Sequence, residues 1–381
     1  MAPKNPLHTQ MCDFFDCEYP IMNAGMDVAG PELVAAVCNA GGFGSLGTGR
    51  GSPDLLKREI RRVKELTDKP FAVQLMSPSK GRVNAIAREQ ALPEEHVLFV
   101  KGLQEEFSIP EPKNMPPRKE PVDPMELLEV AWEEDVPFWI CFFGSAGEDV
   151  VKEAHSHGVK VINSVGNTRH VEKCLPMGVD GFIATGYEGG AHRGDVGSMA
   201  LIPQVVDAAE GKPVMAAGGI ADGRGLVAAL ALGAVGVTCG TAFLLSPECG
   251  IWDTQIALWE HESNQPWYVD AFKKQLIEAK DHDTNPSHAV SGGPLRTLNN
   301  DFTGAWKRPE APATLAMGQQ PMLIRDSLRA AFENQRLDLL PNAAGQIIGL
   351  LDHERHASQV IYEMMTEAVQ VLERVSLPDQ G

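Results

Sequence analysis

Short apolar runs alternate with amphipathic helical patterns over the first 245 residues, and this alternation constrains the fold more than any other feature of the chain. Runs that are apolar throughout are typical of strands buried on both faces. Several of the intervening patterns open on Pro, Asp, Asn or Ser and close on Gly, as helices do. The predicted strands are residues 20–24, 42–47, 71–76, 138–143, 160–165, 181–186, 214–219 and 236–243. The predicted helices between them are residues 31–40, 53–66, 123–134, 147–158, 167–178, 198–211 and 221–233.

These units predict an α/β fold. Strands that are separated by helices pair in parallel, and eight such units over about 240 residues fit a closed (β/α)8 TIM barrel better than an open sheet. The barrel is expected over residues 1–247, with an insertion at 77–122 after the third strand that is polar and rich in proline. Residues 248–344 are expected to form a smaller accessory domain on the substrate side, and residues 345–381 to supply a C-terminal helix that packs back on the barrel.

Composition narrows the possible partners and the compartment. The formal net charge of -18 disfavours binding to nucleic acid and to anionic membrane surfaces. Residues 226–245 carry no charge and have the length of a membrane span, but their glycines and their change from a helical to a strand-like pattern indicate a soluble core. The number of cysteines, seven, is odd, so they cannot all pair in disulfides. The N-terminus has no apolar segment of the kind found in a signal peptide. Both features favour a protein of the reducing cytoplasm. We therefore expect a cytoplasmic protein.

The stretch GYEGGAHRG, residues 186–194, places His192 among glycines directly after the sixth predicted strand. Glycine has no Cβ and lets the backbone approach a ligand closely. In a barrel this loop lies at the C-terminal end of a strand, where active sites are built. The alternative is an ordinary turn whose histidine forms only local hydrogen bonds.

Two further glycine-bearing segments follow the seventh and eighth strands, AAGGIADG at 216–223 and CGTAF at 239–243. Barrels often hold a phosphate at this place with exposed backbone N–H groups. The candidates are Gly218, Gly219, Gly240 and the hydroxyl of Thr241. Two tight turns without room for side chains would give the same letters. The fragment GFGSLG at 42–47 matches a dinucleotide fingerprint, but it is itself the apolar run and no helix follows it at once, which argues against that function.

Loop six lies beside loops seven and eight in a barrel, so a phosphorylated, flat cofactor held by the two glycine segments would pass close to His192. At this point the sequence resembles the nitronate monooxygenase family, also called 2-nitropropane dioxygenase-like, whose members are FMN-dependent barrels. The resemblance covers nearly the whole chain. It rests on PIMNAGMDVAGPELVAAVCNAGGFGSLG, GVDGFIATGYEGGAHRG, PVMAAGGIADGRGLVAALALGAVGVTCGTAFLLSPE, SGGPLRTLNN and GQIIGLL.

The resemblance implies that His192 is the catalytic base and that FMN is the cofactor. Imidazole titrates near neutral pH and can accept a proton there. Two positions depart from the family pattern, because Gly189, Gly190 and Ala191 replace the usual Ala-Gly-Gly and Gln74 stands where asparagine is common. The implied cofactor-binding residues are Asn23, Ala24, Gly25, Met26, Gln74, Gly186, Gly190, Ala217, Gly218, Gly219, Gly240 and Thr241.

The expected activity is the oxidation of alkyl nitronates, small-molecule substrates, with O2. An NAD(P)H-dependent flavin reductase of an enoyl thioester or quinone is one alternative, and a barrel that binds a phosphorylated ligand without redox chemistry is another. No metal site is expected, because the Asp and His residues at 281–288 and 352–356 lack ligand spacing. Roles for Tyr187, Arg193 and Arg296 stay open, and the chain is compatible with a homo-oligomer.

Overall fold

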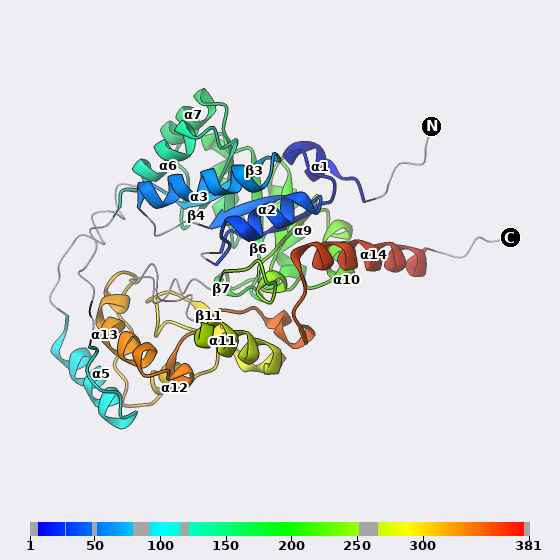
Figure 1. Cartoon of the computed structure of the whole chain (residues 1–381). Helices are drawn as coiled ribbons and strands as arrows, with labels where there is room; N and C mark the ends of the chain where they lie inside the picture. Colours follow the sequence, from blue (N-terminus) through cyan, green and yellow to red (C-terminus); the bar gives the residue numbers. More distant parts are fainter. Residues whose placement is uncertain are drawn as a thin grey trace, which may run out of the picture.

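Eight parallel strands form the centre of the molecule in this computed structural model, which describes residues 7–26, 28–47, 52–78, 92–113, 115, 122–250 and 266–376 (Figure 1). The strand order is β1-β9-β8-β6-β5-β4-β3-β2, and a parallel bridge between Met22 and Phe43 joins the two ends of this order. The predicted (β/α)8 barrel is therefore confirmed. The strands are β1 Ile21–Asn23, β2 Gly44–Gly47, β3 Phe71–Met76, β4 Phe138–Phe142, β5 Lys160–Val165, β6 Gly181–Thr185, β8 Val214–Ala217 and β9 Gly236–Cys239.

Helices follow the strands where the capping signals predict them. Ser52 caps α3 and Asp222 caps α10, each through a side-chain oxygen that accepts a backbone N–H. Pro53 and Pro124 stand in the first turns of α3 and α6. The helices of the barrel are α2 Pro31–Asn39, α3 Pro53–Leu66, α6 Pro124–Glu133, α7 Glu148–Ser156, α8 Thr168–Cys174, α9 Ser198–Ala208 and α10 Gly223–Ala231.

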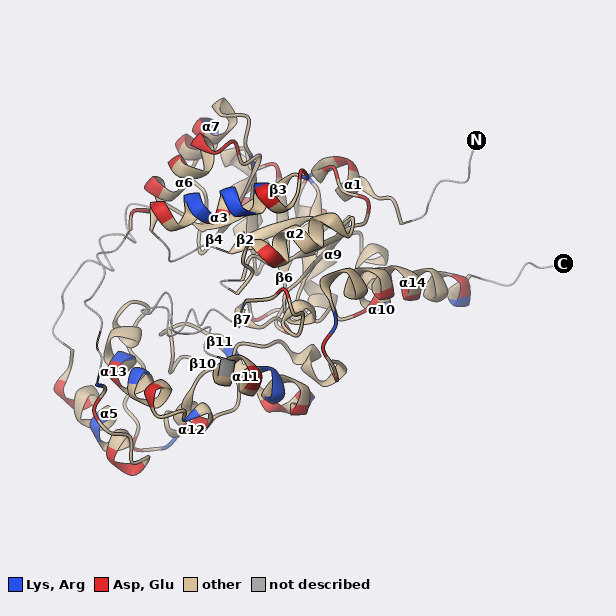
Figure 2. Ribbon diagram, in the orientation of Figure 1, with Lys and Arg blue, Asp and Glu red and all other residues tan. Residues whose placement is uncertain are grey.

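Two apolar layers hold the barrel together. The larger one lies between the strands and the surrounding helices, and the smaller one fills the barrel interior with side chains such as Met22, Phe43 and Phe138. The short helix α1, Gln10–Phe15, adds Met11 and Phe15 to the interior layer. The strands of the barrel are almost free of charge, whereas the outer helices carry most acidic and basic residues (Figure 2).

The fragment GFGSLG lies on strand β2 rather than in a phosphate loop. A Cβ on Gly44 would lie 2.7 Å from both Cys38 Sγ and a methyl carbon of Val34 on α2. The glycine therefore lets α2 pack directly on the strand.

A second layer of elements lies on one side of the barrel and includes part of the insertion (Figure 1). Its helices are α5 Glu94–Glu106, α11 Pro266–Glu278, α12 Asp301–Ala305 and α13 Gln319–Glu333, and its strands are β10 Thr284–Ser287 and β11 Leu295–Leu298. Helix α5 comes from the insertion and packs against the accessory segment, by which we mean the described part of residues 248–344. Glu106 forms an ion pair with Arg308 at 2.6 Å, and Phe99 contacts Trp306 edge-on. Strand β7, Ala191–His192, extends this layer by pairing with β11.

The C-terminal segment lies against the barrel helices. Helix α14, Ala357–Val375, packs on α10 and α2, and a 3-10 helix over Gln346–Leu350 precedes it. The helical pattern at 345–356 therefore gives only this short turn of helix. Residues 251–265 of the expected accessory domain lie outside the described residues.

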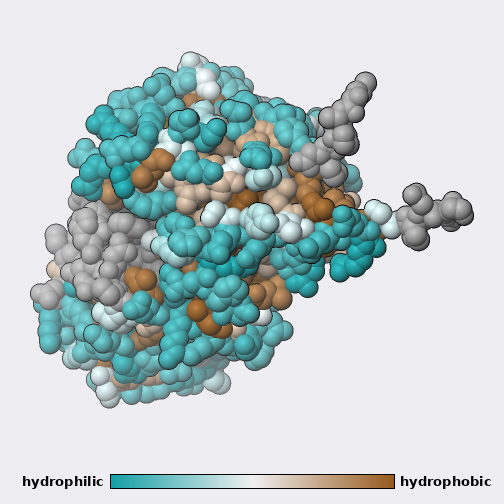
Figure 3. Space-filling model, turned by 45° about the vertical axis from the view of Figure 1, so that its right-hand side comes forward, coloured by the Kyte–Doolittle hydropathy of each residue, from teal (hydrophilic) through white to brown (hydrophobic). Residues whose placement is uncertain are grey.

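The surface in Figure 3 is mainly hydrophilic, with small and separate hydrophobic patches. Within the described part of the chain, no helix has the length and apolar character needed to cross a membrane. None of the seven cysteines takes part in a disulfide.

Candidate active site

A cavity of about 340 Å³ lies at the C-terminal ends of the barrel strands, between the barrel and the accessory segment. Its size is in the range of small-molecule and cofactor sites. The structure brings His192 and most of the sequence-predicted cofactor residues into its wall. These residues are Ala24, Gly25, Met26, Gln74, Gly190, Ala217, Gly218, Gly219, Gly240 and Thr241.

Two of the predicted cofactor residues lie behind this wall. The Asn23 side chain is fully buried, donates to the carbonyl of Ser45 at 2.8 Å and accepts from its N–H at 2.9 Å. Asn23 thus links β1 to β2 at the closure of the barrel. Gly186 packs against the start of α9, where a Cβ would lie 2.0 Å from Ser198 Oγ.

The glycine-bearing turns that follow β6, β8 and β9 lie together at one rim of the cavity. Gly218 and Gly219 have φ values of 91° and 78°, in the region that favours glycine. A Cβ on Gly218 would lie 3.0 Å from the Gly186 carbonyl and 3.1 Å from the Gly189 N–H. The backbone of the turn after β8 therefore directly contacts the histidine loop, residues 186–194.

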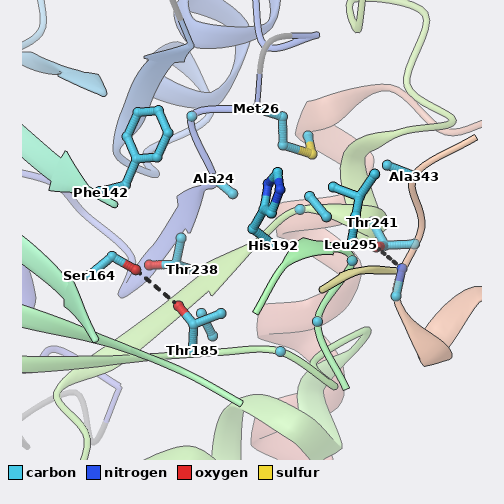
Figure 4. Close-up of a pocket in the computed structure, with 18 of the residues that line it drawn as sticks. Ala24, Met26, Phe142, Ser164, Thr185, His192, Thr238, Thr241, Leu295 and Ala343 are labelled. Atoms are coloured by element: carbon cyan, nitrogen blue, oxygen red, sulfur yellow. Dashed lines mark hydrogen bonds between the residues drawn. The ribbon is translucent and has the colours of Figure 1, made fainter. Parts of the chain in front are cut away.

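The turn after β9 and Gly345 of the C-terminal segment complete this rim. A Cβ on Gly240 would lie 3.2 Å from Met26 Sδ. Thr241 Oγ1 accepts a hydrogen bond from the Gly345 N–H at 2.8 Å (Figure 4), which leaves its own proton available for donation. The rim thus consists mainly of backbone and one hydroxyl.

Glu188 fixes the histidine loop from behind. Its carboxylate accepts from the Ser198 N–H at 2.9 Å and from Ser198 Oγ at 2.8 Å, at the first residue of α9. Its carbonyl accepts from the Gln346 N–H at 2.9 Å. A carboxylate at a helix N-terminus is favourable because of the helix dipole.

His192 is half-buried and reaches the cavity from β7 (Figure 4). Its backbone pairs with Leu295 of β11, and its Nε2 lies 2.8 Å from Ser291 Oγ. The Phe143 ring meets the imidazole edge-on, with 4.6 Å between the ring centroids. Phe143 has a φ of 55°, a conformation that costs energy for an aromatic residue and that recurs at functional sites. The imidazole is therefore held from the barrel side and from the accessory side.

Several lining residues were not among the predicted site residues, although most of them lie in segments that carry the family resemblance. The hydroxyls of Ser164 on β5 and Thr185 on β6 lie 3.2 Å apart, and Thr238 of β9 also faces the cavity (Figure 4). A polar residue near the end of a buried strand is a signal that could have identified all three. Ser291, Leu295 and Ala343 come from the accessory and C-terminal segments, and their place in the wall depends on tertiary packing that no local pattern encodes.

The two arginines left open by the sequence stack on Tyr187. The Arg193 guanidinium lies 4.1 Å and that of Arg296 4.6 Å from the Tyr187 ring centroid. Arg193 is therefore not solvated, since its side chain is only 2% exposed. Burial lowers the pKa of Arg296, and a hydrogen bond with the Tyr187 side chain opposes this shift. The guanidinium also donates to the Tyr187 carbonyl at 3.1 Å. Arg296 of β11 thus joins the accessory segment to the histidine loop, whereas Arg193 contacts residues of its own loop.

Within the described ranges, no cluster of three or more His, Cys, Asp or Glu side chains has the grouping of a metal site. His282 contacts its neighbours Asp281 and Asp283, and all three side chains are exposed.

Comparisons with known proteins agree with this geometry. The family model described as nitronate monooxygenase matches residues 8–367. A protein of Staphylococcus saprophyticus named as a probable nitronate monooxygenase is 36% identical over 78% of this chain and 80% of its own length. A Rhodococcus jostii dehydrogenase named for a hydroxy-methyl-oxo-octahydroindene carboxyl-CoA is 32% identical over 78% of this chain and 68% of its own. The solved nitroalkane oxidase from Streptomyces ansochromogenes superimposes with a TM-score of 0.78 at 26% identity, covering 96% of this chain and 99% of that one.

Proposed function

Because the chain belongs to the nitronate monooxygenase family and is therefore an oxidoreductase, we propose that it binds FMN in the cavity and oxidises alkyl nitronates with O2. His192 acts as the base when the substrate is a neutral nitroalkane. The convergence of His192 with the turns at Gly218 and Gly240 on one rim supports this proposal most strongly.

The residues of the cavity fit a phosphorylated, planar group. Gly218, Gly219 and Gly240 leave most of the rim as backbone, and backbone N–H groups at such turns are suited to phosphate. Thr241 adds a hydroxyl that can donate. Farther inside, Met26 and Ala217 provide apolar surface against which a ring can lie.

When bound, FMN would accept electrons from the substrate and pass them to O2. The protein supplies position and proton transfer. His192 takes the proton from the α-carbon of a neutral nitroalkane, and Phe142 and Phe143 form an apolar wall beside the imidazole that excludes water. A nitronate has already lost that proton, so its oxidation needs the cofactor and the pocket but not the base.

Anaerobic mixing tests this function. The purified protein, incubated with FMN if needed, is mixed without O2 with an alkyl nitronate and, separately, with NADH or NADPH, while the visible absorption of the flavin is followed. We expect bleaching by the nitronate and no rapid bleaching by either nicotinamide alone. Rapid bleaching by a nicotinamide, with none by the nitronate, contradicts the proposal.

The rival function is a flavin-dependent reductase or dehydrogenase of a thioester. The Rhodococcus jostii relative is named as the dehydrogenase of a carboxyl-CoA compound, and this name favours the rival function. The anaerobic experiment separates the two functions, because a nicotinamide-dependent reductase is bleached by NADH or NADPH alone. A protein that binds no flavin at all would instead fit a non-redox barrel that holds a phosphorylated ligand.

A further inference from the structure

Arg296 is buried where the accessory segment meets the histidine loop, and the proposed function gives it no role. It lies on β11 next to Leu295, which lines the cavity beside His192 (Figure 4). Successive side chains of a strand point to opposite faces, so Arg296 points away from the cavity, and its guanidinium lies 4.6 Å from the Tyr187 ring centroid. Arg296 is only 1% exposed. A full positive charge is therefore buried behind the cavity wall.

The hydrogen bonds of this guanidinium connect two segments of the chain. Its Nη2 donates to the Tyr187 carbonyl at 3.1 Å, and its Nη1 donates to Thr284 Oγ1 on the neighbouring strand β10 at 3.1 Å. These partners are neutral, and the buried Nε of Arg296 has no hydrogen-bond partner among the described residues. Burying a charge among neutral partners costs free energy, so stability alone does not explain why a guanidinium stands here.

The same strand also holds the far end of the histidine loop. Strand β11 pairs with β7, and Arg296 stands opposite Ala191 in this pairing. The loop is thus bound to β11 twice, at Ala191 through the backbone and at Tyr187 through the Arg296 side chain. Gly189 and Gly190 lie between these two points, and glycine restricts the backbone less than any other residue. The course of the loop therefore depends on how firmly the two points are held.

Ala191 places strain directly beside the proposed base. Its φ is 54°, in the left-handed region that residues with a Cβ rarely adopt, and the family pattern has glycine at this position. Such a conformation persists only where the surrounding structure enforces it. The strand partner of Ala191 is Arg296, and the next residue is His192. Release of the loop from Arg296 would therefore let Ala191 relax and would displace the imidazole.

We propose that Arg296 is a positioning residue that holds the strained Ala191 and thereby fixes His192 in its reactive position. The proposal rests on the proposed function, in which His192 is the base. It goes beyond that function because it gives the buried guanidinium a task in the reaction and names the strained residue through which it acts.

Hydrogen exchange of the full chain, followed by mass spectrometry, tests the contact without an assay of activity. In Arg296→Met, peptides from residues 186–194 should exchange about tenfold faster, the order expected when a hydrogen bond from a charged group is lost. Peptides from α14 should keep their wild-type rates. Unchanged exchange at residues 186–194 overturns the proposal. Faster exchange throughout the chain, α14 included, indicates a purely structural role and also overturns it.

Two further variants make this comparison specific. Arg336→Met is the matched control, because Arg336 of the accessory segment also donates to a backbone carbonyl, that of Phe107 at 2.7 Å, which lies outside the histidine loop. It should leave exchange at residues 186–194 unchanged. Thr284→Val keeps Arg296 but removes one acceptor of its guanidinium, so the same peptides should exchange faster, by less than in Arg296→Met. If Arg296→Met does not fold, wild-type exchange of these peptides in Thr284→Val overturns the proposal.

Kinetics with saturating FMN test whether the contact serves proton uptake. Arg296→Met should lower kcat for a neutral nitroalkane about tenfold, with a much smaller effect on a preformed nitronate, because only the nitroalkane needs the base. Equal losses on both substrates contradict a role in positioning the base. If wild type oxidises neither substrate, the proposed function fails, whereas hydrogen exchange still decides whether Arg296 holds the loop.

Ala191→Gly tests the strained residue through which Arg296 acts. Glycine adopts the same φ without strain, so the loss of nitroalkane turnover caused by Arg296→Met should be smaller in the Ala191→Gly background than in wild type. The four chains form a double-mutant cycle in kcat. A loss of equal size in both backgrounds contradicts the proposal that Arg296 acts through Ala191.

Discussion

At the scale of single residues, the hydrogen bonds of Glu188 and His192 give these two side chains of the cavity wall different tasks. Both oxygens of the Glu188 carboxylate are engaged by Ser198 at the start of α9, which makes Glu188 an anchor for the loop. His192 is oriented in the cavity wall by its contacts with Ser291 and Phe143. Glu188 and the proposed base His192 lie four residues apart, so the loop that carries His192 is fixed at its root.

Replacing the imidazole tests the base. His192→Asn should retain FMN, because the glycine rim is unchanged, and should lower turnover of neutral nitroalkanes by about 10²- to 10⁴-fold, the usual contribution of a general base. Oxidation of a preformed nitronate should fall much less. Steady-state O2 consumption with the two substrates measures both effects. Unchanged turnover of the neutral nitroalkane removes the base assignment.

Adding one methyl group tests the rim. In Gly218→Ala the added methyl group would lie 3.0 Å from the Gly186 carbonyl oxygen, at a residue whose φ is 91°. The variant should therefore lose FMN affinity as well as stability. Gly211→Ala is the control, because Gly211 has a φ of 83° but nothing within 4 Å of its Cβ position. Both variants should lose about 1–2 kcal/mol of stability from left-handed strain. Flavin fluorescence titration should show weaker binding only in Gly218→Ala, and equal affinity in both variants would contradict the assigned rim.

At the scale of elements, Asn23 replaces backbone pairing where the barrel closes. A parallel bridge joins Met22 of β1 to Phe43, the residue before β2, and the Asn23 amide adds two hydrogen bonds to Ser45 of β2. Asn23→Ala leaves buried Ser45 groups without these partners, and we expect a loss of about 2 kcal/mol in the free energy of unfolding. Urea unfolding at matched flavin content measures it. Asn299→Ala, at an exposed position, is the control, and a similar loss in both variants would contradict the closing role of Asn23.

Helix α10 follows the glycine rim, and its cap predicts a pH dependence. Burial raises the pKa of Asp222, but hydrogen bonds from Arg224 and from the Gly225 N–H outweigh it, so the net shift is below the ordinary value of 3.8. The ionised cap therefore contributes stability that is fully present above that ordinary value and is lost as the pH falls through the lower, folded-state pKa.

Asp222→Asn keeps a cap but removes this titration. At neutral pH the variant should be less stable by about 1 kcal/mol, and the difference from wild type should shrink as the pH falls to about 3. Urea unfolding at several pH values gives the two curves. A difference that stays constant or grows toward acid pH contradicts the assigned cap.

At the scale of the whole molecule, the sequence predicts the barrel more completely than the cavity. Each strand and helix of the barrel carries its own signal, such as the apolar run at β4 or the Ser52–Pro53 start of α3, and so the eight units could be read locally. The nitronate monooxygenase resemblance is confirmed by the family match over residues 8–367.

The rest depends on contacts between distant parts of the chain. Ser291 reaches His192 because β11 pairs with β7, and α5 joins the accessory segment through the Glu106–Arg308 ion pair. No local sequence pattern indicates which strands pair in the short β10–β11–β7 sheet or which residues form this exposed ion pair. Likewise, the letters around Asn23 do not reveal that its amide closes the barrel instead of lining the cavity.

The most direct test of the central claim is a titration of the flavin-free chain with FMN and with riboflavin, followed by flavin fluorescence. If the rim at Gly218, Gly219, Gly240 and Thr241 holds a phosphate beside His192, one FMN should bind per chain, at least about tenfold more tightly than riboflavin, since charge-assisted bonds to the phosphate are lost. Equal affinity for FMN and riboflavin, or binding of neither, would contradict the account.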